Sequence, residues 1–377
     1  MKRFFCALLA LTMVLALTAC GGGNDSGGAG GASAGGNTSA GGDASNVQPP
    51  ASDPDLVASE VDINNPSTTG SEMTLSLNHV GATTHPYQYG CAKFAQLVNA
   101  YTDGAIGITV YPASQIASGA KAIEFVQMGT LDMCLESTMS LENFVVESGV
   151  LNLPFLFTTK DEVYTVLDGP VGDELKEIAE GYGFKILCWM DNGFRDITNT
   201  KRSITMPDDL KGMMLRTPES SVFIDTFTQF GATSTAMPVS EVFSAIQLGT
   251  VDGQENPVSN NVNNKFYEVC DYYSVTHHIY TAEPLILSMD KWNSLTAEQQ
   301  AAMQQAADEA CAYERQKSDE TDAANLQVIK DYGCTVNELT PEQSAAFQDA
   351  CKPLYEKYES TYGDLIGKIQ DAVAKVG

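Results

Sequence analysis

Three of the five arginines in this chain, Arg195, Arg202 and Arg216, fall within 22 residues. The rest of the chain is strongly acidic, with 48 Asp and Glu against 21 Lys and Arg and a formal net charge of −27. Arginine presents a planar fork of N–H donors that holds a carboxylate through two parallel hydrogen bonds, and its charge does not titrate near neutral pH. The cluster therefore indicates a site for an organic anion. The alternative for any one arginine is a structural salt bridge to one of the protein's own carboxylates.

The other residue types that carry chemistry form no catalytic or metal-binding pattern. The four histidines show neither H-E-x-x-H spacing nor cysteines at zinc-ligand spacing. The "GASAG" stretch at 31–35 matches G-x-S-x-G, but glycine-rich sequence surrounds it instead of the strand and helix that a nucleophile elbow requires. We therefore expect no enzymatic activity, no metal and no cofactor. The acidic balance also argues against binding nucleic acid, whose phosphates would be repelled.

The nine cysteines predict neither a disulfide framework nor a zinc site. Cys6 and Cys20 belong to the N-terminal region. The other seven are odd in number, scattered, and without C-x-x-C spacing, so we expect buried thiols that pack as small hydrophobic groups. They are Cys91, Cys134, Cys188, Cys270, Cys311, Cys334 and Cys351.

The N-terminus has the anatomy of an export signal. Lys2 and Arg3 precede a short apolar run that ends in "LTAC". This ending resembles the bacterial lipobox, in which the cysteine, here Cys20, receives a diacylglyceryl group. We expect a signal peptide over 1–19, a disordered Gly/Ser-rich linker over 20–71, and an extracytoplasmic protein held to the membrane by its lipid anchor.

From residue 72 onward, strand-like and helix-like segments alternate, which predicts an α/β fold with a partly parallel sheet. "VQMGTLDM" at 126–133 and "IQLGTVDG" at 246–253 repeat one pattern, in which a glycine ends a helix and a strand follows. The repetition predicts two similar α/β lobes. Capping boxes at "TAEQ" (296–299) and "TPEQ" (340–343) begin two long C-terminal helices, and the first is long enough to bridge both lobes.

Several stretches between residues 73 and 373 resemble the DctP-type solute-binding proteins of TRAP transporters, in family order and at family spacing. The "VDGQENP" segment beside a single-arginine "LRTPES" is the most specific of them. The stretches are "LPFLF" (153–157), "VLDGPVG" (166–172), "NGFRDITNTKRSI" (192–204), "DLKGMMLRTPES" (209–220), "AMPVSEVFSAIQLGTVDGQENP" (236–257) and "NKFYEV" (264–269).

The resemblance implies two α/β lobes, joined by hinge strands and a long bridging helix, that close over a ligand in the cleft between them. Lobe I would comprise 72–193 with 282–320, and lobe II would comprise 194–281 with 321–377. The partners implied are the small and large TRAP membrane subunits, and we expect the binding protein itself to be a monomer.

The family's ligand contacts map onto three positions. Arg216 of "LRTPES" would pair with the ligand carboxylate, Arg195 of "NGFR" would be a second carboxylate or hydroxyl contact, and Asn256 of "GQENP" would be another contact. Arg202 is expected to be structural. Many relatives carry an aromatic residue where this chain has Val239, which predicts a differently shaped pocket floor.

Position near the expected cleft adds four candidates. His79 at the end of the first strand and Glu136 in "LES" would be polar contacts, Glu219 would accept from ligand hydroxyls, and Trp189 would form an apolar wall. Because two of the set His79, Glu136 and Asn256 would serve hydroxyl groups rather than a second carboxylate, the favoured ligand is a sugar acid such as a uronate. A C4-dicarboxylate remains the alternative, with Arg195 holding the second acid group. A lipoprotein that senses an acid without transporting it also remains open.

Overall fold

The computed structural model describes residues 47–376. The expected signal peptide, the lipidation site Cys20 and the linker up to residue 46 lie outside these residues. Within the described part of the chain, no helix combines the length and the apolar character needed to cross a bilayer.

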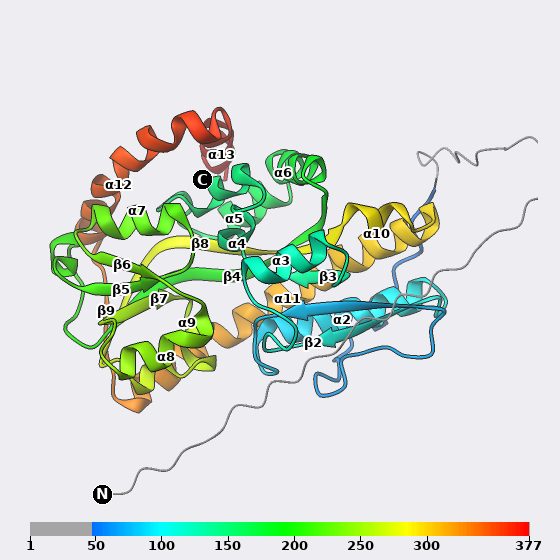
Figure 1. The fold of residues 1–377 in the computed structure, drawn as a ribbon, viewed down its shortest axis with the longest axis horizontal. Helices are drawn as coiled ribbons and strands as arrows, with labels where there is room; N and C mark the ends of the chain where they lie inside the picture. Colours follow the sequence, from blue (N-terminus) through cyan, green and yellow to red (C-terminus); the bar gives the residue numbers. More distant parts are fainter. Residues whose placement is uncertain (1–46, 377) are drawn as a thin grey trace, which may run out of the picture. The chain divides into compact units, whose positions relative to one another are not determined.

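The core of the fold is one nine-stranded sheet that is built from two groups of parallel strands. The strand order is β2-β1-β3-β8-β4-β7-β5-β6, and β9 pairs with β8. Two long strands, β4 (Phe184–Asn199) and β8 (Tyr272–Ser288), run antiparallel through both groups and connect them (Figure 1). The others are β1 (Met73–His79), β2 (Ile106–Tyr111), β3 (Met133–Leu135), β5 (Met214–Thr217), β6 (Thr233–Ala236), β7 (Gly253–Asn256) and β9 (Thr335–Glu338).

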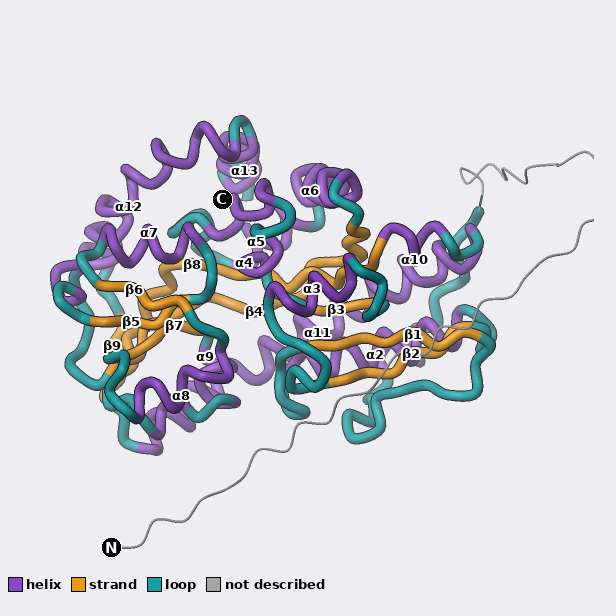
Figure 2. Tube along the Cα trace, in the orientation of Figure 1, coloured by secondary structure: helices purple, strands orange, loops and turns teal. Residues whose placement is uncertain are grey.

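Helices cover both faces of each group, so that the strands lie inside and the helices outside (Figure 2). Lobe I contains β1–β3 and the helices packed on them, and lobe II contains β5–β7 and β9 with theirs. The helices are α1 (Pro54–Ala58), α2 (Pro86–Tyr101), α3 (Ala120–Gln127), α4 (Thr138–Leu141), α5 (Lys160–Leu167), α6 (Pro170–Gly181), α7 (Ser221–Gln229), α8 (Val239–Gln247), α9 (Val258–Asn263), α10 (Met289–Asn293), α11 (Ala297–Tyr332), α12 (Pro341–Tyr362) and α13 (Leu365–Val373).

The repeated sequence pattern corresponds to the same local structure in both lobes. Helices α3 and α8 each end just before a glycine in the left-handed region, Gly129 at φ 69° and Gly249 at φ 72°. The aspartate three residues later then accepts from the backbone N–H of a neighbouring strand at 2.9 Å in each lobe, Asp132 from Ser76 and Asp252 from Met214. The predicted pair of similar α/β lobes is confirmed.

Helix α11 bridges the lobes, as its length suggested. It begins at the expected capping box of Thr296 and ends before Gly333, which has φ 109°. Along its 36 residues it contacts α2 of lobe I and the connecting strand β4, and then α9 and β9 of lobe II.

Residues 47–71 differ from the expected disordered linker, because they pack against lobe I as a strap. Lys93 of α2 is buried and donates from Nζ to the carbonyl oxygens of Leu56 at 2.8 Å and Ser59 at 2.6 Å. Thr68 exchanges hydrogen bonds with Ile108 on β2, the edge strand of the sheet. These contacts are made largely by backbone groups, which every residue carries, so the amino-acid composition of the segment does not predict them. The sequence alone therefore placed the start of the folded part at residue 72.

The C-terminal helices also depart from the expected assignment of 321–377 to lobe II. Phe347 and Cys351 of α12 belong to the lobe II core, but Tyr358 and Tyr362 belong to the apolar cluster around α5 and α6 of lobe I. Helix α13 packs on the same cluster through Leu365, Ile366 and Ile369. The chain therefore crosses back to lobe I near its end.

Seven cysteines lie in the described residues, and all are free thiols. Six are buried, and Cys334 is partly exposed, which agrees with the expected packing role.

Candidate functional site

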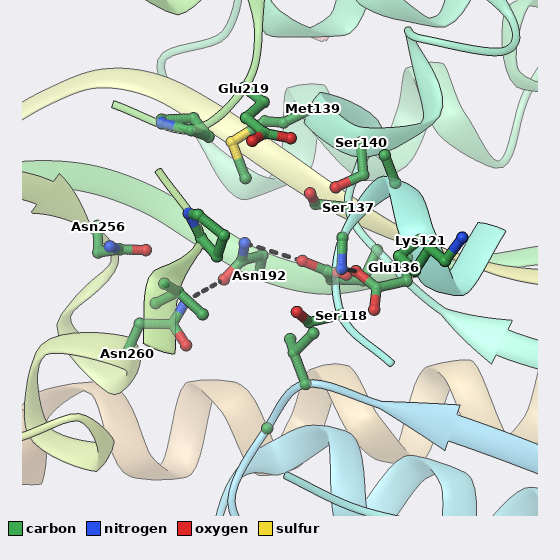
Figure 3. A pocket seen from close by; sticks show the side chains of 18 of the residues that line it. Ser118, Lys121, Glu136, Ser137, Met139, Ser140, Asn192, Glu219, Asn256 and Asn260 are labelled. Carbon is green, nitrogen blue, oxygen red and sulfur yellow. Dashed lines mark hydrogen bonds between the residues drawn. The ribbon is translucent and has the colours of Figure 1, made fainter. Parts of the chain in front are cut away.

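A cavity of about 420 Å³ lies between the two lobes. Lobe I contributes the loop after β1, the segment before α3 and the residues that follow β3. Lobe II contributes the ends of β5 and β7 and the start of α8. Figure 3 shows Glu136, Ser137 and Ser118 on one side and Asn256, Asn260 and Glu219 on the other. Such a position, where strand ends from two α/β units meet, suits a small-molecule site.

Arg216 is a buried cation on this cavity, at the end of β5. Its Nε and Nη2 donate to the backbone carbonyl of Met237 at 2.9 and 2.7 Å. Among residues 47–376 no carboxylate lies within ion-pair distance of it, and its Nη1 has no hydrogen-bond acceptor. Burial lowers the pKa of Arg216 to about 10, which still leaves it charged at neutral pH. The side chain is therefore held in place by a neutral oxygen while its charge has no protein counter-ion.

Arg195 also lines the cavity, but a protein carboxylate already balances its charge. Its Nε and Nη2 bind Glu255 Oε2 and Oε1 at 2.6 and 3.0 Å, and both residues are fully buried. Burial raises the pKa of Glu255, but the charge and hydrogen bonds of Arg195 together with the nearby His278 more than offset this and lower it. Only Nη1 is weakly used, at 3.4 Å from Thr281 Oγ1. Arg195 can thus offer a hydrogen bond to a ligand without contributing net charge.

Asn256 lies beside this ion pair and is held by two hydrogen bonds. Its Oδ1 accepts from Arg195 Nη2 at 2.9 Å, and its Nδ2 donates to Gln254 Oε1 at 2.5 Å. One N–H of the amide remains for a ligand.

Two buried carboxyl groups face the cavity from lobe I and the hinge strand β8. Glu136 Oε2 accepts from the Gly119 N–H at 3.1 Å, and Glu283 Oε1 accepts from Asn192 Nδ2 at 3.0 Å. The second oxygen of each is buried without a partner in the described residues. Burial raises the pKa of Glu283 to about 8 and raises that of Glu136 well above its ordinary value. Burial thus favours the protonated form of both acids, which can donate as well as accept.

His85 and Tyr87 add two more buried polar atoms to the same wall, and sequence reasoning did not select either. His85 Nδ1 accepts the Tyr87 N–H at 3.3 Å as the N-cap of α2, which leaves the proton on Nε2. Burial lowers the pKa of His85 to about 3, so the ring is neutral. Within residues 47–376 neither His85 Nε2 nor the Tyr87 hydroxyl has a hydrogen-bond partner.

The rim of the cavity carries exposed charges of both signs. Glu219 lies on the lobe II side, as expected for a pocket residue, and Lys121 lies on the lobe I side, where it pairs with Glu124 at 2.7 Å (Figure 3). Val239, the predicted departure from the family pattern, is the first residue of α8 and lines the cavity.

The structure does not bring His79 or Trp189 to the cavity, so these two expectations are corrected. His79 is fully buried and its Nε2 lies 2.7 Å from Gln88 Oε1, which fixes it behind the cavity wall. Trp189 is 1% exposed and packs in the apolar cluster of α5 and α6. Five of the seven predicted residues therefore line the cavity: Arg216, Arg195, Asn256, Glu136 and Glu219.

One missed residue did carry a signal in the sequence. Glu283 is an acidic residue in the apolar segment "TAEPLILS". Burying a carboxyl group in such a segment costs free energy, so its presence there indicates a specific role. His85 and Tyr87 carry no comparable signal, because the loop before α2 brings them to the cavity only in the folded chain.

The chain matches the family model of the bacterial extracellular solute-binding proteins, family 7 (DctP), over residues 77–361. It belongs to this family. The 2,3-diketo-L-gulonate-binding periplasmic protein of Escherichia coli is 32% identical over 277 residues, covering 74% of this chain and 84% of the relative.

Two solved structures share the fold of this family member at TM-score 0.76. A TRAP periplasmic solute-binding protein from Sulfurospirillum deleyianum with bound succinate is 34% identical and covers 80% of this chain and 99% of its own. One from Sulfitobacter with bound β-D-galacturonate is 29% identical, with the same coverage of 80% and 99%. The DctP-type recognition and the two-lobe fold expected from the sequence are confirmed.

Proposed function

We propose that this protein captures a sugar acid such as a uronate between its lobes, with the ligand carboxylate on Arg216. One observation carries the proposal. Arg216 is a buried guanidinium on the cavity with no carboxylate partner among residues 47–376. An unpaired buried charge is costly, and an anionic ligand removes that cost by binding through Nη1 and the second Nη2 hydrogen.

The charge of the cavity favours a ligand with one carboxylate. Arg195 and Glu255 neutralise each other, and burial favours the protonated forms of Glu136 and Glu283, so among residues 47–376 Arg216 is the buried cation of the cavity that has no carboxylate within ion-pair distance. A monoanion balances this charge. A second carboxylate on the ligand would meet the neutral acids of lobe I instead of another free cation.

The lobe I wall favours a ligand rich in hydroxyl groups. Glu136 Oε1, Glu283 Oε2, the Tyr87 hydroxyl and His85 Nε2 are four buried polar atoms that form no well-aligned hydrogen bond in the described part of the chain, although the Tyr87 hydroxyl lies near Glu283 and the His85 ring near Asn260. Hydroxyl groups both donate and accept, so a polyol can satisfy all four, whereas a short apolar acid leaves them unpaired. The ligand named for the E. coli relative and the galacturonate bound in the Sulfitobacter structure belong to this chemical class.

We infer that capture proceeds by closure of the lobes about β4 and β8. The protein would then deliver its ligand to the small and large membrane subunits of a TRAP transporter. We further propose that Cys20 carries the lipid anchor that keeps the protein near them. If so, Cys20→Ala would release the protein from the membrane fraction, and retention of that variant would argue against lipidation.

A C4-dicarboxylate is the second candidate. The succinate bound in the Sulfurospirillum structure favours it, together with the weakly used Nη1 of Arg195.

A thermal-shift panel separates the two candidates, because a ligand that binds only the native state raises the melting temperature. The panel contains galacturonate, glucuronate, galactonate and gluconate as sugar acids, with succinate and malate as dicarboxylates. We expect the largest shifts from the sugar acids. Shifts from the dicarboxylates alone would replace the proposed ligand class, and no shift from any acid would overturn organic-acid capture.

A further inference from the structure

A second cavity, of about 740 Å³, lies between α6, β4 and α11 and shares no lining residue with the ligand site. Its lining includes the thiols of Cys188 on β4 and Cys311 on α11, together with Arg315 one turn after Cys311. The two cysteines are far apart in sequence and only 5% and 4% exposed, so the cavity is their route to solvent.

The two sulfur atoms are neighbours. Cys311 Sγ donates to the carbonyl oxygen of Trp189, the residue that follows Cys188, at 3.0 Å. Both side chains belong to the same apolar cluster, and each thiol shifts the pKa of the other. Both are free thiols in this structure.

The pair is asymmetric. Cys188 and the charge of Arg315 lower the pKa of Cys311 although burial opposes them, whereas Cys311 and burial raise the pKa of Cys188 despite the same Arg315 charge. A lowered pKa increases the fraction of thiolate, which is the nucleophile in disulfide exchange. Cys311 is thus suited to react first and Cys188 second.

We propose that Cys188 and Cys311 are a dithiol site that forms a reversible disulfide by exchange with a small disulfide that enters the second cavity. The Cys311 thiolate attacks one sulfur of the incoming disulfide, forms a mixed disulfide and expels one thiolate, which takes up the proton that Cys311 lost. Cys188 then loses its proton and attacks the Cys311 sulfur, expelling the second thiolate. The two cysteines are oxidised, and the incoming disulfide is reduced to two thiols.

The bond would join β4, which passes between the lobes, to α11, which bridges them. A covalent link closing a loop of this length constrains the unfolded chain, so the oxidised protein should unfold at a higher denaturant concentration than the reduced protein.

The test uses 2-hydroxyethyl disulfide, which is small and uncharged. The reduced native protein is treated, quenched with acid, alkylated in denaturant and digested without reductant for mass spectrometry. We expect a peptide pair joined through Cys188 and Cys311, lost on adding dithiothreitol. In Cys188→Ser we expect Cys311 to carry half of the reagent as a mixed disulfide. In Cys311→Ser we expect Cys188 not to react with the reagent, so that the alkylating agent modifies it.

Cys351→Ser is the matched control, because Cys351 is buried in the lobe II core away from this cavity, and it should leave the cross-link unchanged. Full alkylation of both thiols in the wild-type protein would overturn the proposal without relying on any variant. A link between Cys270 and Cys334 in place of the proposed pair would overturn it as well.

Discussion

Arg195 and Glu255 form a fully buried, two-pronged ion pair across neighbouring strands β4 and β7, with Nε–Oε2 and Nη2–Oε1 distances of 2.6 and 3.0 Å. The arginine cluster read from the sequence therefore divides into different roles. The ion pair has no net charge, but it holds Arg195 at the cavity as a hydrogen-bond donor. Arg216 has no carboxylate partner among residues 47–376, so its charge is available to the ligand.

Removing one partner of this pair should destabilise the fold. We expect Glu255→Gln to lower the free energy of unfolding by about 3–5 kcal/mol, because it leaves the buried Arg195 charge uncompensated. Urea unfolding measures the loss. Glu241→Gln, an exposed position in α8, is the control and should change stability little. Equal stability of the two variants would contradict the role assigned to the pair.

Substitution of Arg216 should lower the affinity for the ligand. Truncation of one partner of a desolvated charge pair costs about 2–5 kcal/mol, or roughly 30- to several-thousand-fold in affinity. We expect this loss in Arg216→Ala, and a large loss in Arg216→Lys, which lacks the planar fork. Calorimetry with the acid selected by the thermal-shift panel measures both. The exposed Arg202→Ala is the control, and wild-type affinity in Arg216→Lys would refute two-pronged recognition.

Affinity for an anionic ligand should fall as pH rises through about 8, the pKa to which burial raises Glu283. Below this pH Glu283 is a neutral donor, and above it a carboxylate repels the ligand. Its neighbours are Asn192, Tyr87, Arg195 and Glu136. The decline can reach about tenfold per pH unit, since one proton is taken up on binding. Affinity is measured by calorimetry between about pH 6 and pH 9, a range in which Arg216 keeps its charge. If Glu283 is responsible, the affinity of Glu283→Gln should not change across this range.

The raised pKa of Glu283 also makes the free energy of unfolding depend on pH. In the unfolded chain Glu283 ionises near 4.5, but in the folded protein it ionises near 8, so the folded state binds its proton more tightly. Its contribution is fully present below pH 4.5 and is lost as pH rises toward 8. We therefore expect Glu283→Gln to gain stability relative to wild type across this window. A difference between the two proteins that does not change with pH would show that Glu283 is already ionised.

The strap of residues 47–71 should be needed for full stability. A chain that begins at Glu72 loses the Leu56 and Ser59 carbonyls that accept from Lys93 Nζ, together with the Leu56 and Val57 side chains that pack on the lobe I core. We expect it to unfold more easily than a chain that begins at Val47, by about 1–3 kcal/mol, because apolar burial and charge-assisted hydrogen bonds are lost together. Adding Lys93→Met should recover part of the loss in the shorter chain and destabilise the longer one. Guanidinium unfolding of all four proteins tests this, and equal stabilities would assign the strap no structural role.

The sequence predicted those features that a local pattern determines. The helix-ending glycines at 129 and 249, the capping boxes at Thr296 and Thr340, and the arginine near the end of β5 are each decided within a few residues. His79 was placed on the cavity because it ends β1, but the direction of its side chain depends on Gln88 in α2. His85, Glu283 and the strap likewise owe their positions to contacts between distant segments, which no local pattern encodes.

The path of α12 has a mechanical consequence. The helix leaves the lobe II core and joins the lobe I cluster close to Pro353, which lies inside it. Proline has no N–H, so the carbonyl of Asp349 lacks its usual helical donor and the helix bends more easily there. Any rotation of one half of the molecule against the other must flex this surface helix as well as the strands behind the cavity. Bending of α12 at Pro353 would thus contribute to the free-energy cost of lobe closure, although this residue does not line the ligand cavity. Substitutions near Pro353 would then change the equilibrium between the open and closed forms.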